Sequence, residues 1–479
     1  MLLFEKEKIY GDKILAVDDK DRKVTYDQLD AFSGELYSKV GGKKLIFILC
    51  ENTIESLFGY LGCLKTGIVP LMLESRIHSS LLNSLIGEYH PAFLYVPENC
   101  IEKAEDSEVI WKSGSYCLCR RNEKLLPALY SELSLLLTTS GSTGSPKLVR
   151  QSSVNIEANG RSIASYLEID ANERPITTLP MNYTYGLSII NSHVLMGCTL
   201  LITKYGVLEP EFWNFARKKR ASSLAGVPYT YQILKRIGFM EMDLPDLKTM
   251  TQAGGKLPTS LHKEFALYAK RTNRKFIVMY GQTEATARMG YLPADKSLEK
   301  CGSMGIAIPG GRFWLEDEQG NEIIEPDSPG ELVYQGKNVT LGYACCKDDL
   351  IKPDERRGVL HTGDIASRDS EGYYYITGRK KRFIKVYGSR VNLDEVERLL
   401  KEQYEGFNFA CVGTDDNLTI YTDCSSPDAG KEILDYLYRV TGIGRAAAVR
   451  YRNKIPKNES GKTLYQELET TTDNRMECK

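Results

Sequence analysis

The chain has 479 residues, 42% of them hydrophobic, which is enough for two or three domains with sizeable cores. Its 62 lysines and arginines nearly balance its 63 aspartates and glutamates, so no whole-molecule field attracts nucleic acid or an anionic membrane. A charged N-terminal stretch and interrupted apolar windows predict neither a secretory signal nor membrane insertion. The scattered cysteines, with no C-x-x-C pair, favour a cytoplasmic location.

Short apolar runs alternate with longer amphipathic stretches up to about residue 300. The run at 43–50 predicts a strand, and a helix is expected to begin near Asn52. A strand at 68–73, a helix at 80–89 and a strand at 92–96 follow. This rhythm predicts repeated βα units around a mostly parallel sheet.

Beyond about residue 300 the pattern changes to glycine-punctuated strands, which predict hairpins and a small β-rich subdomain. The basic run GRKKRFIKVYGSR at 378–390 is followed by a helix start at Asn392, which is typical of a domain boundary. We therefore expect an α/β protein with three parts. They are a large domain at 1–378 that includes the β-rich subdomain at about 300–378, a hinge at 379–382, and a small mobile α/β domain at 383–479.

The stretch TTSGSTGSPK at 138–147 follows the apolar run LSLLL. Hydroxyls and glycines after a strand can direct several donors at one point, and Lys147 adds a mobile positive charge. The stretch predicts a phosphate-binding loop, with a solvated turn as the alternative. It lacks the G-x-x-x-x-G-K-[ST] pattern, and the SGKT at 460–463 has Pro456 in place of the first glycine, which disfavours a phosphotransferase.

Five segments together resemble the adenylate-forming superfamily of acyl-CoA and aryl-CoA synthetases, nonribosomal adenylation domains and beetle luciferases. They are TTSGSTGSPK at 138–147, YGQTEAT at 280–286, HTGD at 361–364, GRKKRFIKVYGSRVNLDEVE at 378–397 and IPKNESGKT at 455–463. They stand in the family's order and span most of the chain. The resemblance implies activation of a carboxylic acid by ATP to acyl-AMP and pyrophosphate, and then transfer to a thiol of CoA or of a carrier protein's phosphopantetheine.

The resemblance also implies roles for individual residues. Contacts with ATP are expected from Thr139, Ser140, Gly141, Ser142, Thr143, Gly144, Lys147, Gly254, Gly255, Lys256, Tyr280, Gly281, Asp364 and Arg379. Tyr280 would stack on the purine, and Asp364 would accept both ribose hydroxyls. Thr283 would contact the α-phosphate, and Glu284 would be the Mg²⁺ ligand.

Two lysines are expected to act through domain movement. Lys462 matches the catalytic lysine that bridges the carboxylate and the α-phosphate when the small domain closes. Lys381 matches the hinge position around which that domain swings before thiol attack. The basic run around Lys381 could instead suggest nucleic acid, but no aromatic stacking pattern accompanies it, and a charge run is usually a solvated face.

The acid-binding region resembles the family less closely. Tyr183 stands where many acyl-CoA synthetases have histidine, and Thr184 stands where amino-acid activators carry aspartate. A buried ammonium without a carboxylate is costly, so an α-amino acid is disfavoured. Arg288 could pair with a second acidic group on the substrate or lie on the surface. The expected lining of the acyl pocket is Tyr183, Thr184, Val227, Pro228, Tyr229 and Met289, with Arg288.

Three hypotheses for the function remain. The leading one is an ATP-dependent ligase that joins an aryl or fatty acid to a thiol. A stand-alone amino-acid adenylating enzyme that charges a carrier protein is the nearest alternative. A non-catalytic nucleotide-binding protein of the same fold is the third, and the presence of Glu284, Asp364 and Lys462 argues against it.

Overall fold

The computed structural model describes residues 10–138, 147–386, 389–414, 417–426, 428–441, 447–457 and 463–469. It divides into two compact units. The first comprises Met1–Phe313 with Tyr334–Leu360, and the second comprises Trp314–Val333 with His361–Lys479. The division expected from the sequence, with a hinge at 379–382 between domains 1–378 and 383–479, stays a prediction.

An eight-stranded sheet dominates the start of the first unit, in the order β18-β9-β8-β4-β3-β5-β7-β6. Strands β5, β3, β4 and β8 are parallel, and the outer strands pair antiparallel. The strands are β3 (Leu45–Cys50), β4 (Val69–Glu74), β5 (Phe93–Pro97), β6 (Ser107–Ser113), β7 (Tyr116–Arg121), β8 (Leu133–Thr138), β9 (Leu148–Ser152) and β18 (Gly342–Ala344). The βα units predicted for 43–96 are thus confirmed.

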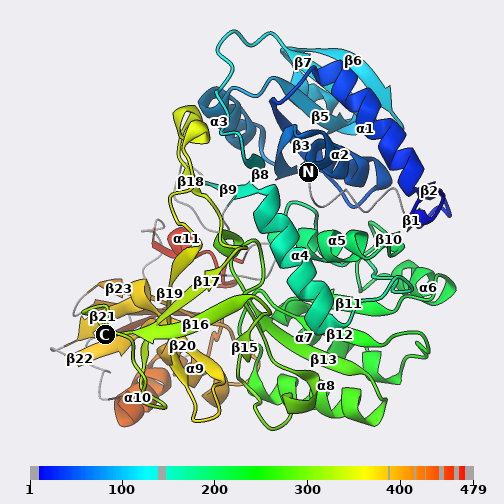
Figure 1. Ribbon diagram of the computed structural model, residues 1–479. Helices are drawn as coiled ribbons and strands as arrows, with labels where there is room; N and C mark the ends of the chain where they lie inside the picture. Colours follow the sequence, from blue (N-terminus) through cyan, green and yellow to red (C-terminus); the bar gives the residue numbers. More distant parts are fainter. Residues whose placement is uncertain are drawn as a thin grey trace. The chain divides into compact units, whose positions relative to one another are not determined.

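Helices cover both faces of this sheet (Figure 1). Alternate residues of β3 point to opposite sides, so that Ile46 packs in one core cluster and Phe47 in another. The first cluster contains α1 (Tyr26–Val40), α2 (Ile54–Thr66) and α5 (Thr184–Leu195), and the second contains α3 (Ser79–Tyr89). Helix α2 is capped by Thr53, whose side chain accepts from the Ser56 amide, so the helix start expected at Asn52 is one residue early.

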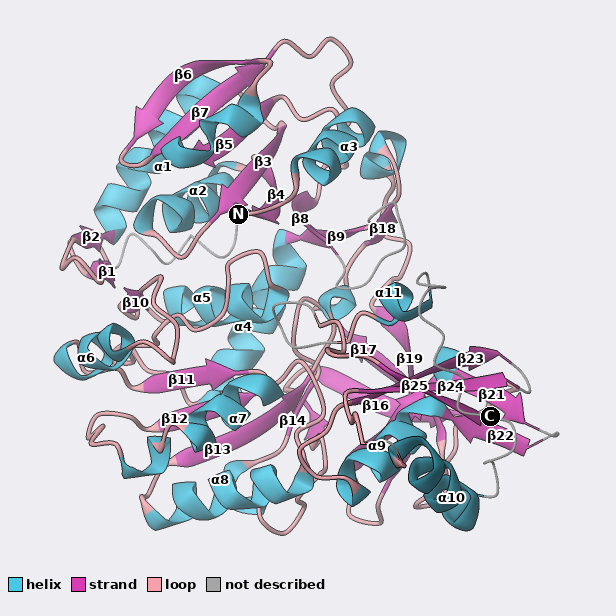
Figure 2. Ribbon diagram, turned by 180° about the vertical axis from the view of Figure 1, so that it is seen from behind, coloured by secondary structure: helices cyan, strands magenta, loops and turns pink. Residues whose placement is uncertain are grey.

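A second sheet in this unit has the order β11-β12-β13-β14-β15, and its first three strands are parallel. Its strands are β11 (Ser223–Gly226), β12 (Thr249–Gln252), β13 (Lys275–Tyr280), β14 (Gly290–Tyr291) and β15 (Ile306–Ala307). Helices α7 (Pro228–Arg236) and α8 (Thr259–Arg271) run along it (Figure 2). The unit also contains α4 (Ser153–Leu167), α6 (Pro210–Lys218) and a small sheet of β10 (Leu200–Ile202), β1 (Ile14–Asp18) and β2 (Lys23–Thr25).

The β-rich segment predicted after residue 300 forms a four-stranded sheet in the order β16-β17-β19-β20. Its strands are β16 (Gly311–Glu316), β17 (Gly330–Gly336), β19 (Val359–Arg368) and β20 (Tyr374–Arg379). The 3₁₀ helix η7 (Lys380–Arg382) follows directly. Glycines at both ends of β17 match the punctuation seen in the sequence.

The C-terminal part of the second unit is a small α/β structure with its own core. It consists of the hairpin β21 (Phe383–Val386) and β22 (Ser389–Asn392), the sheet β23 (Phe409–Thr414), β24 (Asn417–Thr422) and β25 (Ala447–Tyr451), and the helices α9 (Leu393–Gln403), α10 (Ala429–Thr441) and α11 (Tyr465–Glu469). Asn392 caps α9 as predicted, because its side chain accepts from the amides of Asp394 and Glu395. The expected α/β architecture is confirmed.

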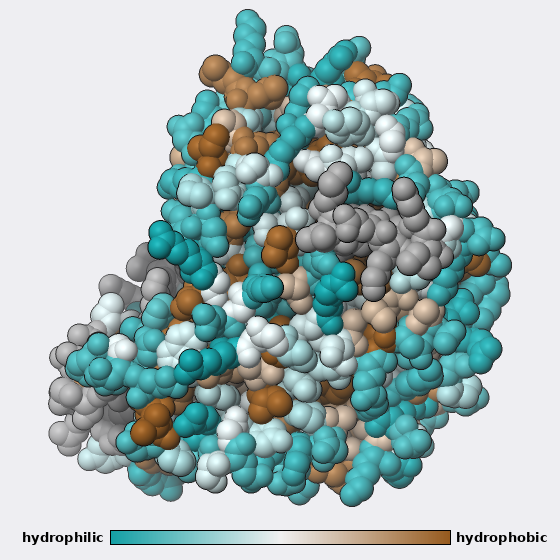
Figure 3. Space-filling model, viewed as in Figure 1, coloured by the Kyte–Doolittle hydropathy of each residue, from teal (hydrophilic) through white to brown (hydrophobic). Residues whose placement is uncertain are grey.

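Polar and apolar side chains are interspersed on the face shown in Figure 3. Within the described ranges, no helix has both the length and the apolar character needed to cross a bilayer. Every cysteine in those ranges is a free thiol. The cytoplasmic location stays a prediction.

Candidate active site

Three of the predicted segments follow the carboxyl ends of neighbouring parallel strands. Residues 227–228 follow β11, residues 253–256 follow β12, and residues 283–284 lie just beyond β13. The three strands pair in that order, all parallel. Because the carboxyl ends of parallel strands meet at one edge of a sheet, the segments predicted for the acid, adenine and Mg²⁺ lie along that edge.

The glycine pair at the end of β12 is in close contact with two predicted acid-binding segments. A Cβ on Gly254 would lie 2.5 Å from the Tyr183 hydroxyl and 3.1 Å from Val227 Cγ1. A Cβ on Gly255 would lie 3.2 Å from Pro228 Cγ, and Gly254 also has a φ of +86°. A side chain at Gly254 would therefore be strained as well as crowded. The structure brings these five residues together, as a shared nucleotide and acyl site requires.

Glu284 is held on both its side chain and its backbone. It lies in the 3₁₀ helix η4 (Thr283–Ala285), and Tyr343 Oη donates to its Oε1 at 2.7 Å. The Glu284 carbonyl accepts from the amide and hydroxyl of Thr340, at 3.0 and 2.9 Å, and from Arg356 Nη1 at 2.9 Å. The Arg356 guanidinium lies 4.7 Å from the Tyr343 ring centroid, and Lys147 Nζ lies 5.7 Å from it.

This arrangement suits a hydrated Mg²⁺ ion. Mg²⁺ is usually bound by one or two carboxylates together with substrate phosphates. Glu284 supplies one carboxylate, and the tyrosine that holds it, Tyr343, also lies beside the Lys147 ammonium. Burial and the neighbouring Glu284 carboxylate raise the pKa of Tyr343 to about 12, so the phenol keeps its proton and donates it. No group of three potential metal ligands occurs among the residues that the structure describes.

The predicted phosphate loop connects two paired strands. Strand β8 leads into it, and the antiparallel register brings Thr138 opposite Leu148 on its far side. Lys147, directly before β9, is described and exposed. The other predicted phosphate contacts lie outside the described residues and stay predictions, namely Thr139, Ser140, Gly141, Ser142, Thr143 and Gly144. The catalytic lysine Lys462 also lies outside them.

The remaining nucleotide-binding predictions in this unit lie at the same sheet edge. Tyr280, Gly281 and Thr283 are half-buried, and Lys256 is exposed. A Cβ on Gly281 would lie 1.5 Å from the Ala287 carbonyl oxygen, so no larger residue fits there. Because Tyr280 ends β13 with part of its ring accessible, it is not the fully buried core aromatic that a strand end alone would favour.

The predicted acid-binding residues have different degrees of burial. Tyr183 is largely buried, which raises the pKa of its phenol to about 12, while Thr184 and Met289 are buried. Tyr229 is half exposed. Arg288 is only 2% exposed, so the surface position that the sequence left open for it is wrong. Its charge has to be accommodated inside the protein.

The two predicted ribose contacts lie opposite each other in the second unit. Asp364 on β19 pairs in register with Arg379 on β20, and Arg379 Nε lies 3.0 Å from Asp364 Oδ1. Asp364 is nearly buried, whereas the Arg379 side chain is 60% exposed. A carboxylate held from one side by a guanidinium suits the binding of a diol from the other side.

The basic run after β20 has a structural role at one of its positions. Arg382 forms ion pairs with Asp394 and Glu397, at 2.5 and 2.6 Å, and its Cζ lies 3.8 Å from the Tyr465 ring centroid. It is therefore committed to the core of the second unit. Lys381 lies beside it in η7, and its role as the hinge stays a prediction.

Tyr343 and Arg356 were not identified from the sequence. Both come from the segment between β17 and β19, far along the chain from Glu284, which they contact. The only local signal is an aromatic residue after Gly342, which is too common to indicate a site. Strand β18 pairs with β9, and this long-range contact brings Tyr343 opposite Val149 and beside Lys147.

Comparison with known proteins agrees with this geometry. The family model described as AMP-binding enzyme matches residues 3–344. The 2-succinylbenzoate–CoA ligase of Oceanobacillus iheyensis is 24% identical, over 88% of both chains. A long-chain-fatty-acid–CoA ligase of Escherichia coli O157:H7 is 30% identical over 75% of this chain and 65% of its own, and a feruloyl-CoA synthase of an Amycolatopsis species is 28% identical over 72% and 70%.

The fold has solved counterparts. The o-succinylbenzoate CoA synthetase of Bacillus subtilis, in complex with its acyl-adenylate intermediate, superposes with a TM-score of 0.78 over 99% of this chain and 98% of its own, at 20% identity. This chain belongs to the AMP-binding enzyme family. The resemblance to the adenylate-forming superfamily is thereby confirmed, and with it the expected class of AMP-forming ligase.

Proposed function

We propose that the protein activates an aryl or fatty carboxylic acid with ATP and transfers the acyl group to CoA. The observation that carries this proposal is the Glu284 carboxylate, held by Tyr343 at the end of β13. It lies at the same sheet edge as Gly254, which is packed against Tyr183 and Val227, and Gly255, which is packed against Pro228. Relatives named as ligases of succinylbenzoate and long-chain fatty acids, and as a feruloyl-CoA synthase, support this choice of acid.

In the first step a carboxylate oxygen of the acid attacks the α-phosphorus of ATP. The bond from that phosphorus to the bridging oxygen breaks, and pyrophosphate leaves with the electron pair. Lys147 and the loop at 139–144 would bind the β and γ phosphates, and Thr283 the α-phosphate. Glu284 would hold Mg²⁺, which neutralises phosphate charge when bound. Asp364 and Arg379 would bind the ribose.

In the second step a thiolate attacks the acyl carbonyl carbon, the mixed-anhydride bond breaks, and AMP leaves. CoA is the acceptor we propose, because the relatives are named as CoA ligases or a CoA synthase. Transfer to the phosphopantetheine of a carrier protein stays a prediction. Rotation around Lys381 would withdraw Lys462 between the two steps.

The reaction class is tested by its products. Enzyme, ATP, Mg²⁺ and CoA are incubated with a panel of aryl, fatty and amino acids, and pyrophosphate exchange and nucleotide release are measured. AMP, pyrophosphate and an acyl-CoA are expected with an aryl or fatty acid. Formation of ADP, or exchange only with amino acids, would contradict the proposal. Glu284→Gln should abolish exchange while leaving the circular dichroism spectrum unchanged.

The role of Lys462 can be tested separately from that of the site around Glu284. Lys462→Ala should lower adenylation by about 100-fold or more, because a transition-state charge contact is lost. Thioester formation from supplied acyl-AMP should fall far less. Equal losses in both steps, measured by single-turnover assays, would overturn this role.

A further inference from the structure

Arg288 is a fully buried arginine whose recorded partners are all neutral. It follows η4 and precedes β14, and only 2% of its surface is exposed. Its Nε donates to Ser188 Oγ at 3.1 Å, and its Nη1 donates to Tyr166 Oη at 3.1 Å. Nη1 also lies 3.1 Å from Met279 Sδ, and the guanidinium lies 4.9 Å from the Tyr185 ring centroid. The side chain is thus positioned by hydroxyls, a thioether and an aromatic ring.

No carboxylate balances this charge within the part of the chain that the structure describes. The acidic residue nearest in the lining of the adjoining cavity is Glu173, and its carboxylate is engaged by the Ser222 hydroxyl and by Lys248 Nζ at 3.6 Å. His193 lines the same cavity, and burial lowers the pKa of His193 to about 4, so it is neutral at pH 7. A buried cation without a counter-charge is strongly disfavoured unless it has another purpose.

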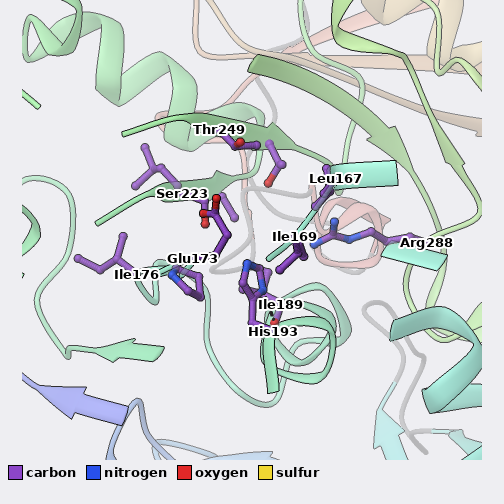
Figure 4. Close-up of a pocket in the computed structure, with 13 residues that line it drawn as sticks. Leu167, Ile169, Glu173, Ile176, Ile189, His193, Ser223, Thr249 and Arg288 are labelled. Carbon is purple, nitrogen blue, oxygen red and sulfur yellow. Dashed lines mark hydrogen bonds between the residues drawn. The ribbon is translucent and has the colours of Figure 1, made fainter. Parts of the chain in front are cut away.

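The guanidinium faces a cavity between α5 and the strands β11 and β12. Figure 4 shows that the Arg288 side chain extends toward Ile169 and His193, with the guanidinium nitrogen atoms at the end that points to them. The cavity volume is about 20 Å³, enough for one water molecule next to the charge. An anionic group beside the planar guanidinium would make paired, charge-assisted hydrogen bonds with it.

Apart from Arg288, none of the residues proposed to bind the acid lines this cavity, but packed side chains connect the guanidinium to them. Tyr185, which lies under the guanidinium, is two positions beyond Tyr183 at the start of α5. Tyr185, Val227 and Met279 belong to one buried cluster, against which Tyr183 packs. Arg288 is also adjacent in the chain to Met289. Tyr185 therefore connects Arg288 to Tyr183, because its ring centroid lies 4.9 Å from the guanidinium and 6.3 Å from the Tyr183 ring centroid.

We propose that Arg288 binds a second anionic group at the far end of the substrate, so that the preferred substrate is a dicarboxylic acid rather than a neutral-tailed fatty or aryl acid. This inference rests on the proposed acid activation and narrows its substrate class. One carboxylate reacts with ATP at the sheet edge, and the other stays ionised and replaces the missing counter-charge of Arg288. The cation then selects against acids whose far end is uncharged, because they leave it uncompensated.

The test compares acids that differ only at the far end. Pyrophosphate exchange is measured for adipate against hexanoate, glutarate against pentanoate, and terephthalate against 4-methylbenzoate. In at least one pair, the diacid should have the higher kcat/KM by about 100-fold. Arg288→Gln should remove this preference, chiefly by raising the KM of the diacid. Arg288→Lys should restore part of the preference, because it keeps the charge without the planar fork.

Two results would overturn the inference while leaving the proposed function intact. One is a monoacid preference in every pair, and the other is a diacid preference that Arg288→Gln does not change. Pyrophosphate exchange with none of the six acids would contradict the proposed function instead. In that case the affinities of wild type and Arg288→Gln for the same six acids, measured by calorimetry, would decide whether Arg288 binds the second anionic group. If Arg288→Gln does not fold, Tyr166→Phe provides a second test, because it removes a hydroxyl that accepts from Arg288 Nη1. This variant should lower the diacid preference about three- to tenfold. An unchanged diacid preference would contradict the inference.

Discussion

Two buried arginines in the first unit have opposite surroundings. Arg150 on β9 is 0% exposed, and its Nη2 lies 2.5 Å from Glu355 Oε2. Its guanidinium also donates to backbone carbonyls of Leu341, Tyr343, Lys352 and Pro353. Arg288 is equally buried, but its recorded partners are hydroxyls, a thioether and a ring. One charge is compensated by the fold, and the other is not.

The difference separates a structural arginine from one available to a ligand. Arg150 ties the segment at 341–355 to β9, and this segment contains Tyr343, which in turn holds Glu284. Because the Arg150 guanidinium has both a carboxylate partner and several carbonyl acceptors, its role is structural. Arg288 is held in place without its charge being neutralised, which is the state expected of a group that awaits an anion.

The strongest test of the comparison is removal of the structural arginine. Arg150→Met should lower the free energy of unfolding by about 3–5 kcal/mol, because the carbonyls and Glu355 lose a buried partner. The measurement is urea unfolding followed by circular dichroism. Glu355→Gln is the matched control and should cost about 1 kcal/mol, since its side chain is 47% exposed. A decrease of less than about 1 kcal/mol in the free energy of unfolding of Arg150→Met would show that Arg150 is not the structural arginine of the two.

The charge at Arg288 can be probed through its neighbour His193. Burial, and secondarily the positive charge of Arg288, lower the pKa of His193 to about 4, against the hydrogen bond to the Ile189 carbonyl. Since the unfolded chain binds the proton first, stability should fall as the pH drops from about 6.5 to about 4. At about 1.4 kcal/mol per pH unit, this group contributes a loss of about 2–3 kcal/mol over that window.

The measurement is urea unfolding of wild type and His193→Gln at pH 7 and pH 4.5. The variant should lose less stability than wild type between the two pH values. His262→Gln serves as a second case, because burial also lowers the pKa of His262 to about 4, at a site hydrogen-bonded to Ser297. Identical pH dependence in wild type and His193→Gln would show that His193 is already protonated or accessible.

Arg150 positions the segment that contains Tyr343, and the effect of Tyr343 on Glu284 can be tested directly. Tyr343→Phe removes the donor to Glu284 Oε1 and should raise the KM for MgATP about tenfold, with little change in the monoacid or diacid KM. Manganese binding measured by electron paramagnetic resonance in the presence of ATP should weaken similarly. Tyr334→Phe is the matched control, because that buried tyrosine donates to Asn338 instead. Equal effects of both variants would assign Tyr343 a packing role only.

The smallest effect is expected for the stability of an Arg288 variant. Arg288→Met should change the free energy of unfolding by about 1 kcal/mol or less, because replacing an uncompensated buried charge by an apolar chain is often neutral. Its two hydroxyl partners keep other contacts, with the Tyr185 carbonyl for Ser188 and with Met279 for Tyr166. A loss as large as that of Arg150→Met would place Arg288 among the structural residues.

Several parts of the site were predictable because they are local in the chain. The hydroxyl-rich loop follows its own strand, and the T-E pair follows β13 within four residues. The alternation of apolar runs predicts the parallel βα units at 43–96, whereas the short strand β12 before Gly254 was not predicted. Helix starts were also predictable to within one residue, as Asn392 and the shift from Asn52 to Thr53 show.

Other parts could not be predicted from spacing. Tyr343 and Arg356 reach Glu284 only because β18 pairs with β9, across about two hundred residues of chain. Arg288 carries no sequence signal for burial, since a lone arginine is usually exposed. Its neutral surroundings come from α4, α5 and β13.

The sequence by itself determined the family and the reaction class, because the motifs that identify them consist of consecutive residues. Only the tertiary structure decided which of two buried cations is neutralised and which faces a cavity uncompensated. The physical reason is that the free energy of a buried charge depends on what surrounds it in space, and those neighbours come from distant parts of the chain.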